Sequence, residues 1–267
     1  MQTEFKLLDH GYLKLVESWG SDEAIIRAAR MSTDKGFLGW GPIRKCSRPS
    51  CGSGDFDFDA GKCRVCGSTD FESRPGDEKL LRYLWEHEHS TPFEMPGLTI
   101  EVQAPIMVFR EWHRHRVPFG YAELSARYTP LPDVNYIPSV ERLMMGSDGK
   151  NKQAGTVKGA EALTEENAKS FQEGLRLIYC NAEQLYQTAL ANGVPKELAR
   201  VHLPVGRYSR MRATGNLRGW TKFLILRMAP FAQWEIRQYA QAVGHLIGDV
   251  FPRTWALFSE SFDKERA

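Results

Sequence analysis

The sequence predicts an α/β (α+β) fold, in which long helices flank a central antiparallel-type sheet. Two observations predict it. Helical periodicity dominates the C-terminal half of the chain, and short strand-like segments lie in the first half. The chain has 267 residues, enough to bury the core of one large domain. We expect that domain to span residues 1–267 and to carry an insert at 36–76.

Three segments are expected to contain strands. The clearest is LTIEVQ at 98–103, where strict alternation places Leu98, Ile100 and Val102 on one face. Such alternation is typical of a strand that has one side on the core. The expected strand segments are 4–16, 98–110 and 121–137.

The expected helices begin at residues that can cap them. Ser21 begins a helix over 21–31 that has acidic residues in its first turn. Asp77 begins a second helix, DEKLLRYLWEHEH. A loop is expected at 146–159, where apolar residues are few. Further helices are expected at 161–192, after Pro195, and at 215–229, 231–250 and 252–263.

Charge and hydropathy exclude two broad classes of protein. The formal net charge is only +2, so no general positive field recruits nucleic acid or an anionic membrane. No run of about eighteen apolar residues is present, which excludes a transmembrane helix. The N-terminal residues carry charges throughout and lack the apolar stretch of a signal peptide. We therefore expect a cytoplasmic protein.

Four of the five cysteines lie close together in the insert. Cys46, Cys51, Cys63 and Cys66 form a C-x4-C-x11-C-x2-C pattern among Gly, Ser, Pro and Asp. In a reducing compartment this pattern indicates a tetrahedral thiolate zinc site rather than disulfides. Four thiolates leave zinc no open position, so the role would be structural. A plain loop with unligated thiols is the alternative. Cys180 lies in a helical pattern and is expected to pack in the core.

Arginine is concentrated in two segments that contain almost no acid. Residues 201–227 have no Asp or Glu, and 105–122 have only Glu111. Arginine exceeds lysine in both, which favours bidentate recognition of phosphate or of a ring carbonyl edge. A single arginine of this kind is more often a solvated surface residue. Two clusters in apolar surroundings indicate an anion site, because a partly buried arginine needs an anion.

The stretch RHRVPFGYAELSARY at 114–128 contains both cations and hydrogen-bonding groups. If 113–116 is extended, its arginines share one face and its histidines the other. Glu123, Ser125 and Arg127 likewise fall on one side at period two, a row that suits a sugar hydroxyl and a phosphate. No GxGxxG turn or Walker loop is present, so any dinucleotide is bound by other means.

This motif resembles the signature of flavin-dependent thymidylate synthases: RHR, then Ser after eight intervening residues, then Ala-Arg-Tyr. Supporting similarity lies in EHEHSTPFE, APIMVFREWHRHR, LARVHLP, GNLRGWTKFLILR and AQWEIRQYA. Only the cysteine insert and the loop near 150 fall outside the pattern. The resemblance implies a homotetramer with active sites at subunit interfaces. It implies FAD as cofactor, dUMP as substrate, methylenetetrahydrofolate as carbon donor and NADPH as reductant.

The resemblance also implies site residues. Those for the flavin would be Thr91, Glu94, Arg114, His115, Arg116, Glu123, Asn216, Arg218 and Lys222. Those for the nucleotide would be Glu111, Arg114, Glu123, Leu124, Ser125, Ala126, Arg127, Arg200 and Arg227. Arg227 would face the pyrimidine and stabilise negative charge, and His89 matches a histidine near flavin and folate, so these two are the candidate catalytic residues. His87 and His89 have two other interpretations, an exposed pair at a helix end and a weak metal pair.

The residue inventory agrees with flavin chemistry. A thiolate that adds to the uracil ring needs a placed cysteine, and Cys180 lies in mid-helix with no adjacent histidine. No general base is evident near Ser125, so we favour a binding role for it. A flavin needs no enzyme nucleophile, and arginines can supply orientation and electrostatics.

Four positions depart from the residues common in the family: Glu111 for Gln, Ala122 for Asn, Lys222 for Asn and Phe231 for His. A carboxylate at 111 repels a phosphate unless an arginine intervenes. The leading hypothesis is methylation of dUMP to dTMP. The departures leave open methylation or hydroxymethylation of UMP or dCMP. A zinc-ribbon nucleic-acid-binding protein is the alternative of a different class, and the near-zero net charge argues against it.

Overall fold

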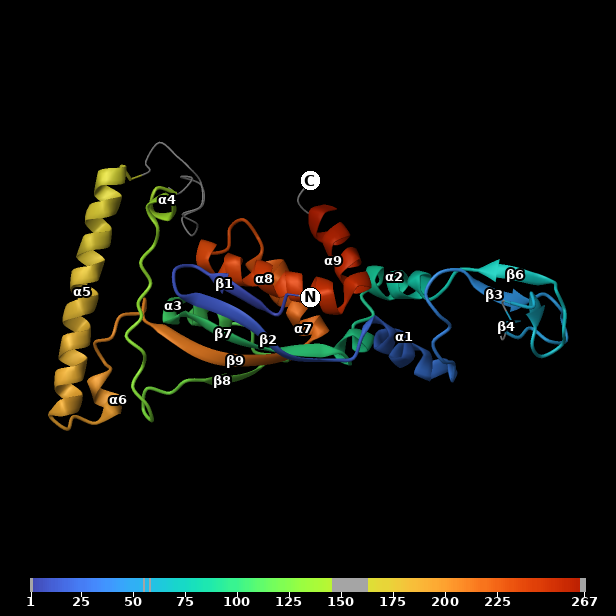
Figure 1. The fold of residues 1–267 in the computed structure, drawn as a ribbon, viewed down its shortest axis with the longest axis horizontal. Coiled ribbons are helices and arrows are strands. Elements are labelled where there is room, and N and C mark those ends of the chain that lie inside the picture. The colour runs from blue at the N-terminus through green and yellow to red at the C-terminus, as the bar shows by residue number, and fades with distance from the viewer. Residues whose placement is uncertain (1, 55, 58, 146–162, 265–267) are drawn as a thin grey trace. The chain divides into compact units, whose positions relative to one another are not determined.

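The computed structural model describes residues 2–54, 56–57, 59–145 and 163–264 (Figure 1). The chain forms two compact units. The first, here called the sheet unit, comprises Met1–Trp19 and Gly97–Val250. The second, here called the insert unit, comprises Gly20–Pro96 and Phe251–Ala267. The predicted insert at 36–76 falls within the second unit. The loop expected at 146–159 lies outside the described residues.

The sheet unit is built on five antiparallel strands in the order β1-β2-β7-β9-β8. This confirms the predicted mixed fold with an antiparallel central sheet. The strands are β1 (Glu4–Leu7), β2 (Gly11–Trp19), β7 (Gly97–Pro105), β8 (Gly120–Glu123) and β9 (Tyr208–Asn216). β7 and β9 pair along their whole length, and Leu98, Ile100 and Val102 are fully buried, as the alternation predicts.

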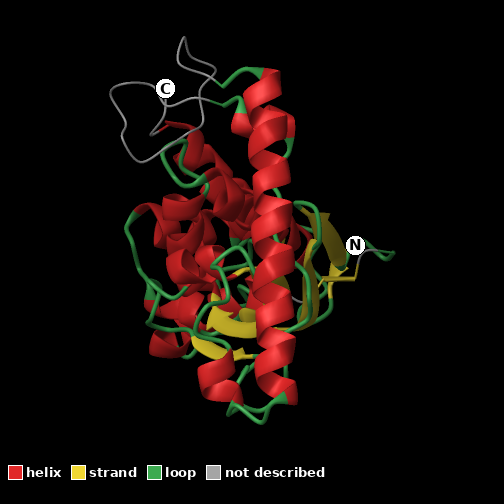
Figure 2. Cartoon of the chain, turned by 90° about the vertical axis from the view of Figure 1, so that its left-hand side faces the viewer, coloured by secondary structure: helices red, strands yellow, loops and turns green. Residues whose placement is uncertain are grey.

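The helices of this unit are α3 (Ile106–Trp112), α4 (Val140–Leu143), α5 (Glu165–Ala191), α6 (Lys196–Ala199), α7 (Leu217–Arg227) and α8 (Trp234–Val250). Trp112, Phe223 and Tyr239 bring α3, α7 and α8 together in a buried aromatic core. The ring centroids of Trp112 and Phe223 are 4.8 Å apart. Helix α5 runs the length of the view in Figure 2.

Several predicted boundaries are wrong. The strand expected at 98–110 ends at Pro105, and 106–112 is helical, because Val108, Phe109 and Trp112 are buried at helical spacing. The segment 4–16 does contain strands, as predicted, and they form the β1–β2 hairpin, whose second strand extends to Trp19. Helix α7 begins at Leu217 rather than 215, because β9 extends to Asn216. The other expected helices differ from the structure by a few residues at their ends.

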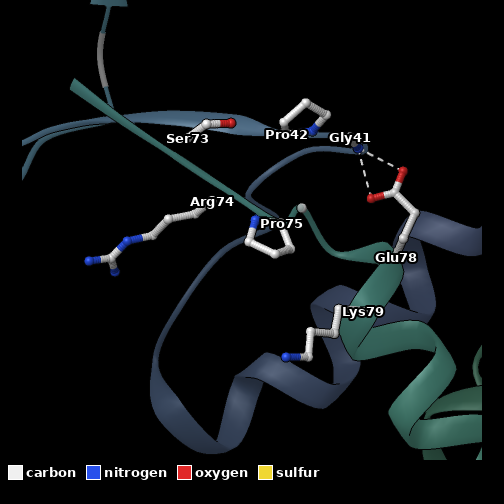
Figure 3. Close-up of a pocket in the computed structure, with 8 residues that line it drawn as sticks. Gly41, Pro42, Ser73, Arg74, Pro75, Glu78 and Lys79 are labelled. Atoms are coloured by element: carbon white, nitrogen blue, oxygen red, sulfur yellow. Dashed lines mark hydrogen bonds between the residues drawn. The ribbon is translucent and has the colours of Figure 1, made fainter.

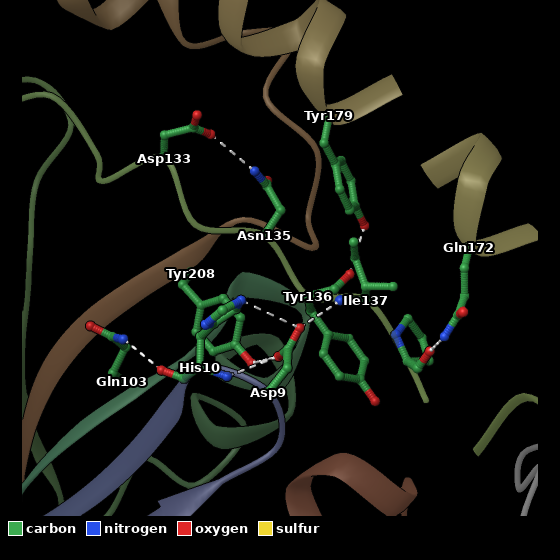
Figure 4. Close-up of polar contacts among 11 residues, drawn as sticks. Asp9, His10, Gln103, Asp133, Asn135, Tyr136, Ile137, Gln172, Tyr179 and Tyr208 are labelled. Carbon is green, nitrogen blue, oxygen red and sulfur yellow. Dashed lines mark hydrogen bonds and ion pairs between the residues drawn. The ribbon is translucent and has the colours of Figure 1, made fainter. Parts of the chain in front are cut away.

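The strand expected at 121–137 is also wrong beyond Glu123. After Glu123 the pairing is reduced to a short backbone bridge between Asn135 and Arg207, flanked by hydrogen bonds from Tyr136 N–H to the Gly206 carbonyl oxygen and from Tyr208 N–H to the Val134 carbonyl oxygen, both at 2.9 Å. Side chains add further contacts on both sides (Figure 4). Asp9 accepts hydrogen bonds from the Tyr208 hydroxyl and from the Ile137 N–H, the latter at 2.9 Å. On the other side, Tyr179 of α5 donates to the carbonyl oxygen of Tyr136 at 3.1 Å. The segment is therefore fixed between the sheet and α5.

Cys180 is exposed on α5, so the prediction that it packs in the core is wrong. The described part of α5 buries only Ala168 and Tyr186 fully, and its apolar residues are otherwise largely exposed. Helical periodicity predicts where this helix lies. It does not show that the described residues of the same chain leave most of its apolar side chains exposed. None of the described helices combines the length and hydropathy that crossing a bilayer requires.

The insert unit consists of short elements. They are α1 (Asp22–Arg30), η1 (Met31–Thr33), β3 (Ile43–Cys46), β4 (Phe56–Asp57), β5 (Lys62–Cys63), β6 (Phe71–Arg74), α2 (Glu78–Glu86), η2 (Thr91–Glu94) and α9 (Pro252–Lys264). β3 pairs with β6 and β4 with β5, both antiparallel. The helices α1 and α2 follow the predicted caps, Ser21 and Asp77, but neither side chain makes a capping hydrogen bond. Asp77 is instead fully buried against Arg30.

Asp22 stabilises a different helix from the one predicted. Its buried carboxylate accepts from the backbone N–H groups of Arg253 at 2.9 Å and Thr254 at 3.1 Å, and from the Thr254 hydroxyl at 2.6 Å. These groups belong to the first turn of α9, where backbone donors lack helical partners. Asp22 therefore joins the start of α1 to the start of α9.

Replacing Asp22 with alanine is expected to lower the free energy of unfolding by about 1–3 kcal/mol, because three donors lose a charged acceptor. Denaturant unfolding monitored by circular dichroism measures this. The control is Glu23→Ala on the same helix, where the lost partner is the exposed Arg27 at 2.6 Å, and a change of less than about 1 kcal/mol is expected. Equal effects of the two substitutions would contradict the capping role.

Candidate active site

Three of the predicted residues, Glu111, His115 and Arg227, are in contact with one another. Arg227 is the last residue of α7. Its side chain is 15% exposed. The Nε group donates to Nε2 of His115 at 2.8 Å, and Nη2 donates to the carbonyl oxygen of Glu111 at 2.9 Å. Nη1 donates to the Glu111 carboxylate. Because a guanidinium has five N–H groups, two remain for a further partner.

His115 is held as a neutral imidazole. Burial, and then the adjacent positive charge of Arg227, lower the pKa of His115 to about 4. Nε2 accepts a hydrogen bond, so the proton is on Nδ1. The Tyr121 hydroxyl donates to the carbonyl oxygen of His115 at 2.6 Å and fixes the backbone there. Near neutral pH this site therefore contains one cation, Arg227, and one acceptor ring.

A carboxylate at position 111 would repel a phosphate unless an arginine neutralised it, and Arg227 does so. Glu111 lies on α3, and its carboxylate forms an ion pair with Arg227. The carboxylate is 40% exposed, so one side of the pair faces solvent. Glu111 thus balances the arginine and holds its guanidinium in place.

The predicted nucleotide residues gather at a second place in the sheet unit. A small cavity of about 120 Å³ lies beside the end of β8. It is lined by Ile106, Glu123, Leu124, Ala126, Leu131, Arg200, Leu203 and Ser209. Four of these residues, Glu123, Leu124, Ala126 and Arg200, are predicted nucleotide residues. A cavity of this size accommodates one end of a nucleotide rather than the whole molecule.

The predicted period-two row is wrong beyond Glu123, where the strand ends. Ser125 begins a turn, in which its hydroxyl oxygen accepts from the N–H of Arg127 at 3.3 Å. The Arg127 side chain points to Glu197, with Nε 3.4 Å from Oε2, and both side chains are more than half exposed. Ser125 and Arg127 do not line the small cavity.

The extended conformation considered for 113–116 is also not observed. His113 follows α3 with helical dihedral angles, and the chain then turns. Arg114 and Arg116 are exposed, and among the described residues neither guanidinium has a carboxylate within 4.0 Å. Two cations are therefore available to an anionic ligand.

The remaining predicted flavin residues are divided between the two units. Asn216, Arg218 and Lys222 lie at the start of α7 in the sheet unit, where the Asn216 side chain caps the helix by accepting from Gly219 N–H at 2.9 Å. His89, Thr91 and Glu94 lie in the insert unit, in and just before η2. His87 and His89 both pack against Tyr83, with ring centroids at 4.1 and 5.5 Å.

A family described as "thymidylate synthase complementing protein" matches residues 14–253. A flavin-dependent thymidylate synthase from Thermosipho melanesiensis is 34% identical over 96% of this chain and 93% of its own. The chain belongs to the flavin-dependent thymidylate synthase family. A relative from Thermus thermophilus is also 34% identical, over 95% of this chain and 77% of its own length.

Solved structures agree with this family membership. The UMP/dUMP methylase PolB from Streptomyces cacaoi, bound with 5-Br UMP, is 28% identical to this flavin-dependent thymidylate synthase homologue. It superposes with a TM-score of 0.71 over 96% of both chains. The same enzyme bound with 5-Br dUMP gives the same score and covers 97% of its own chain.

Sequence reasoning missed Ser209 in this family member. Ser209 lies in β9, is 1% exposed and lines the small cavity together with Arg200. Its hydroxyl has no hydrogen-bond partner among the described residues. Buried polar groups in proteins are almost always hydrogen-bonded, so an exception indicates a ligand or water. The period-two pattern of β9 could have located the strand, but not the unpaired hydroxyl.

Proposed function

We propose that this protein catalyses the flavin-dependent reductive methylation of dUMP to dTMP. The carbon donor is methylenetetrahydrofolate and the reductant is NADPH. Support comes from the family membership and from the PolB structures, which hold analogues of UMP and dUMP. One observation carries the proposal: a half-buried Arg200 and the unpaired Ser209 hydroxyl line one cavity.

The chemistry of that cavity suits the sugar-phosphate end of a nucleotide. Arg200 has no carboxylate within 4.0 Å among the described residues, so its charge is available to a phosphate. Glu123 offers an acceptor for a sugar hydroxyl, and the Ser209 hydroxyl can donate to oxygen. We therefore place the phosphate and ribose here.

The exposed arginines fit a flavin cofactor. Arg114 and Arg116 would pair with the diphosphate of FAD, because neither has a carboxylate partner among the described residues. Asn216, Arg218 and Lys222 of the sheet unit are the further residues of that unit in the proposed flavin set. The family resemblance adds His89, Thr91 and Glu94 of the insert unit. When bound, the flavin supplies hydride transfer.

Arg227 is proposed to act on the pyrimidine. Its two remaining N–H groups would face the ring oxygen on which negative charge accumulates as the carbon is activated. Glu111 and His115 hold the guanidinium before the substrate arrives, so little reorganisation is needed. His115 stays neutral and adds no second cation near the ring.

We propose that the active enzyme is a homotetramer with its active sites at subunit interfaces. Helix α5 exposes Phe171, Ile178 and Leu185, which are 51, 58 and 55% exposed and recur every seven residues. Residues at this spacing share one helix face, and an apolar face of this kind favours association. Sedimentation should give the mass of four chains, and a single-chain mass would contradict the assembly.

The substrate is tested by direct assay. The protein is incubated with FAD, methylenetetrahydrofolate, NADPH and one of dUMP, UMP or dCMP, and products are identified by mass. The expected product is dTMP from dUMP. Turnover of UMP or dCMP without turnover of dUMP would show that the substrate is one of those nucleotides and would contradict the proposal. Transfer of a hydroxymethyl group would show as an added oxygen in the product mass.

Replacing Ser209 with alanine separates ligand binding from folding. Stability should not fall, because a buried unpaired hydroxyl costs free energy in the unliganded protein. The KM for dUMP should rise about ten- to hundredfold, as expected for one lost hydrogen bond to a charged group. Ser18→Ala, at an exposed position of β2, is the control. An unchanged KM with unchanged stability would remove Ser209 from the site.

A further inference from the structure

The four cysteines of the insert converge on one point. Their sulfur atoms all lie within 4.8 Å of one another. The Cys46 and Cys66 sulfurs are 3.5 Å apart, and those of Cys51 and Cys63 are 3.7 Å apart. A zinc ion with four Zn–S bonds of about 2.3 Å has its sulfurs about 3.8 Å apart at the corners of a tetrahedron. The observed arrangement is close to that tetrahedron.

The backbone around the cysteines is shaped for thiolates. The N–H groups of Arg48, Ser53 and Ser68 each hydrogen-bond to the cysteine sulfur two residues earlier. Such amide donors stabilise negative sulfur and orient ligands around a metal.

Each half of the cluster also turns in the same way. Gly52 and Gly67 directly follow a cysteine and have φ of 55° and 70°, the left-handed region that favours glycine. The N–H of Gly52 bonds to the Arg48 carbonyl oxygen at 3.1 Å, and that of Gly67 bonds to the Cys63 carbonyl oxygen at 2.7 Å. Two similar turns therefore present two pairs of cysteines to one centre.

Few apolar side chains are buried among the described residues of the insert. Among the described residues from 36 to 76, the buried apolar side chains are those of Cys46 and Cys63. Val65 and Phe71 are 65% and 41% exposed. Short segments with so few buried apolar side chains are typically stabilised by a metal or by disulfides. The cysteine cluster is therefore the core of the insert.

We propose that Cys46, Cys51, Cys63 and Cys66 bind one structural zinc ion. Two disulfides, from Cys46 to Cys66 and from Cys51 to Cys63, are a poorer fit, because all four sulfurs surround a common centre. Thiols also stay reduced in the cytoplasm, where we expect this protein. Four thiolates close the coordination sphere, so the ion takes no part in the methyl transfer. The proposal is independent of the substrate.

The base of the insert is tied to α2. The Gly41 N–H lies 2.7 Å from both carboxylate oxygens of Glu78, beside an open pocket (Figure 3). The N–H of Asp77 donates to the carbonyl oxygen of Gly39 at 2.9 Å, and the N–H of Leu38 donates to Asp77 at 2.7 Å. The zinc-bound end is thus connected to the helices by a two-stranded neck.

The test is elemental analysis of the full-length protein purified without added metal. We expect about one zinc per chain. Cys51→Ser should lose the zinc, whereas Cys180→Ser, at the exposed position on α5, should retain it. Replacement of zinc by Co²⁺ should give the intense visible absorption of tetrahedral thiolate coordination. Protein without metal, or with iron in place of zinc, would overturn the proposal.

A second measurement on the unmodified protein covers the case in which Cys51→Ser does not fold. Treatment with a chelator should expose residues 36–76 to limited proteolysis, and returning Zn²⁺ should restore protection. Intact mass under non-reducing conditions should show reduced cysteines. A mass lower by two or four hydrogens would identify disulfides and contradict the metal site. Neither readout depends on nucleotide turnover, so failure here is distinct from failure of the proposed function.

Discussion

Arg227→Ala is expected to lower kcat for dUMP methylation by about 10²–10³-fold, the typical cost of removing a preorganised group that stabilises developing negative charge. The reason lies in how the guanidinium is held: Glu111 and His115 fix three of its N–H groups, which leaves two for the proposed contact with the pyrimidine. Steady-state kinetics with dUMP measure the effect. Circular dichroism checks that the variant folds.

Two further variants sharpen this test. Arg227→Lys keeps the charge but loses the fork of donors, so a large loss of kcat is expected here too. Glu111→Gln introduces the residue common in the family and keeps an acceptor for Arg227. It should leave kcat within about threefold, because it removes no donor to the ring. A kcat of Arg227→Ala within threefold of the unmodified protein would remove Arg227 from the chemistry.

Arg207→Met is expected to have the largest effect on stability. Arg207 is 1% exposed and donates to Glu183 at 2.6 Å, to Asp133 at 3.0 Å and to the Leu131 carbonyl oxygen at 3.1 Å. Arg207 directly precedes β9, so it joins the start of that strand to α5 and to the segment 131–133. Removing one partner of a buried ion pair leaves an uncompensated charge, here on Glu183, and typically costs about 3–5 kcal/mol.

Urea unfolding at fixed protein concentration measures this loss, since an oligomer's stability depends on concentration. The matched control is Arg212→Met, because Arg212 is 61% exposed and lies 3.3 Å from Glu101 on the same sheet. Its expected cost is below about 1 kcal/mol. Adding Glu183→Gln to Arg207→Met should recover part of the loss. Similar midpoints for Arg207→Met and Arg212→Met would show that the buried pair contributes little.

The sequence predicted the fold class, the long helices and the strand at 98–103, because periodicity over many residues is set by the core. The predictions were wrong where contacts between segments distant in sequence decide whether a segment forms a strand or a helix. β9 was not predicted although Met211 and Ala213 alternate with exposed arginines, because the same arginines also fit an anion-binding segment of any backbone conformation. The apolar run after Pro105 suits a strand or a helix equally well, and packing of Trp112 decides for the helix.

The candidate site was likewise predicted only in part: the motif identified several residues, and their mutual contacts became known only from the structure. Motif resemblance selected Glu123, Arg200 and Arg227, and the structure brings the first two to one cavity. It could not show that Glu111 forms an ion pair with Arg227, since these residues lie 116 positions apart. Nor could it single out Ser209, because an unpaired hydroxyl is a property of surroundings and not of sequence.

The neck of the insert has a consequence for how this chain could have acquired it. Gly39 and Asp77 are joined by a backbone hydrogen bond, so the chain leaves and re-enters the helical framework at almost the same point. An insertion of nearly forty residues at such a point, or its replacement by a tight turn, leaves the ends of α1 and α2 in place. We therefore expect a chain shortened between Gly39 and Asp77 to keep α1 and α2 folded, which circular dichroism and limited proteolysis of such a variant would check.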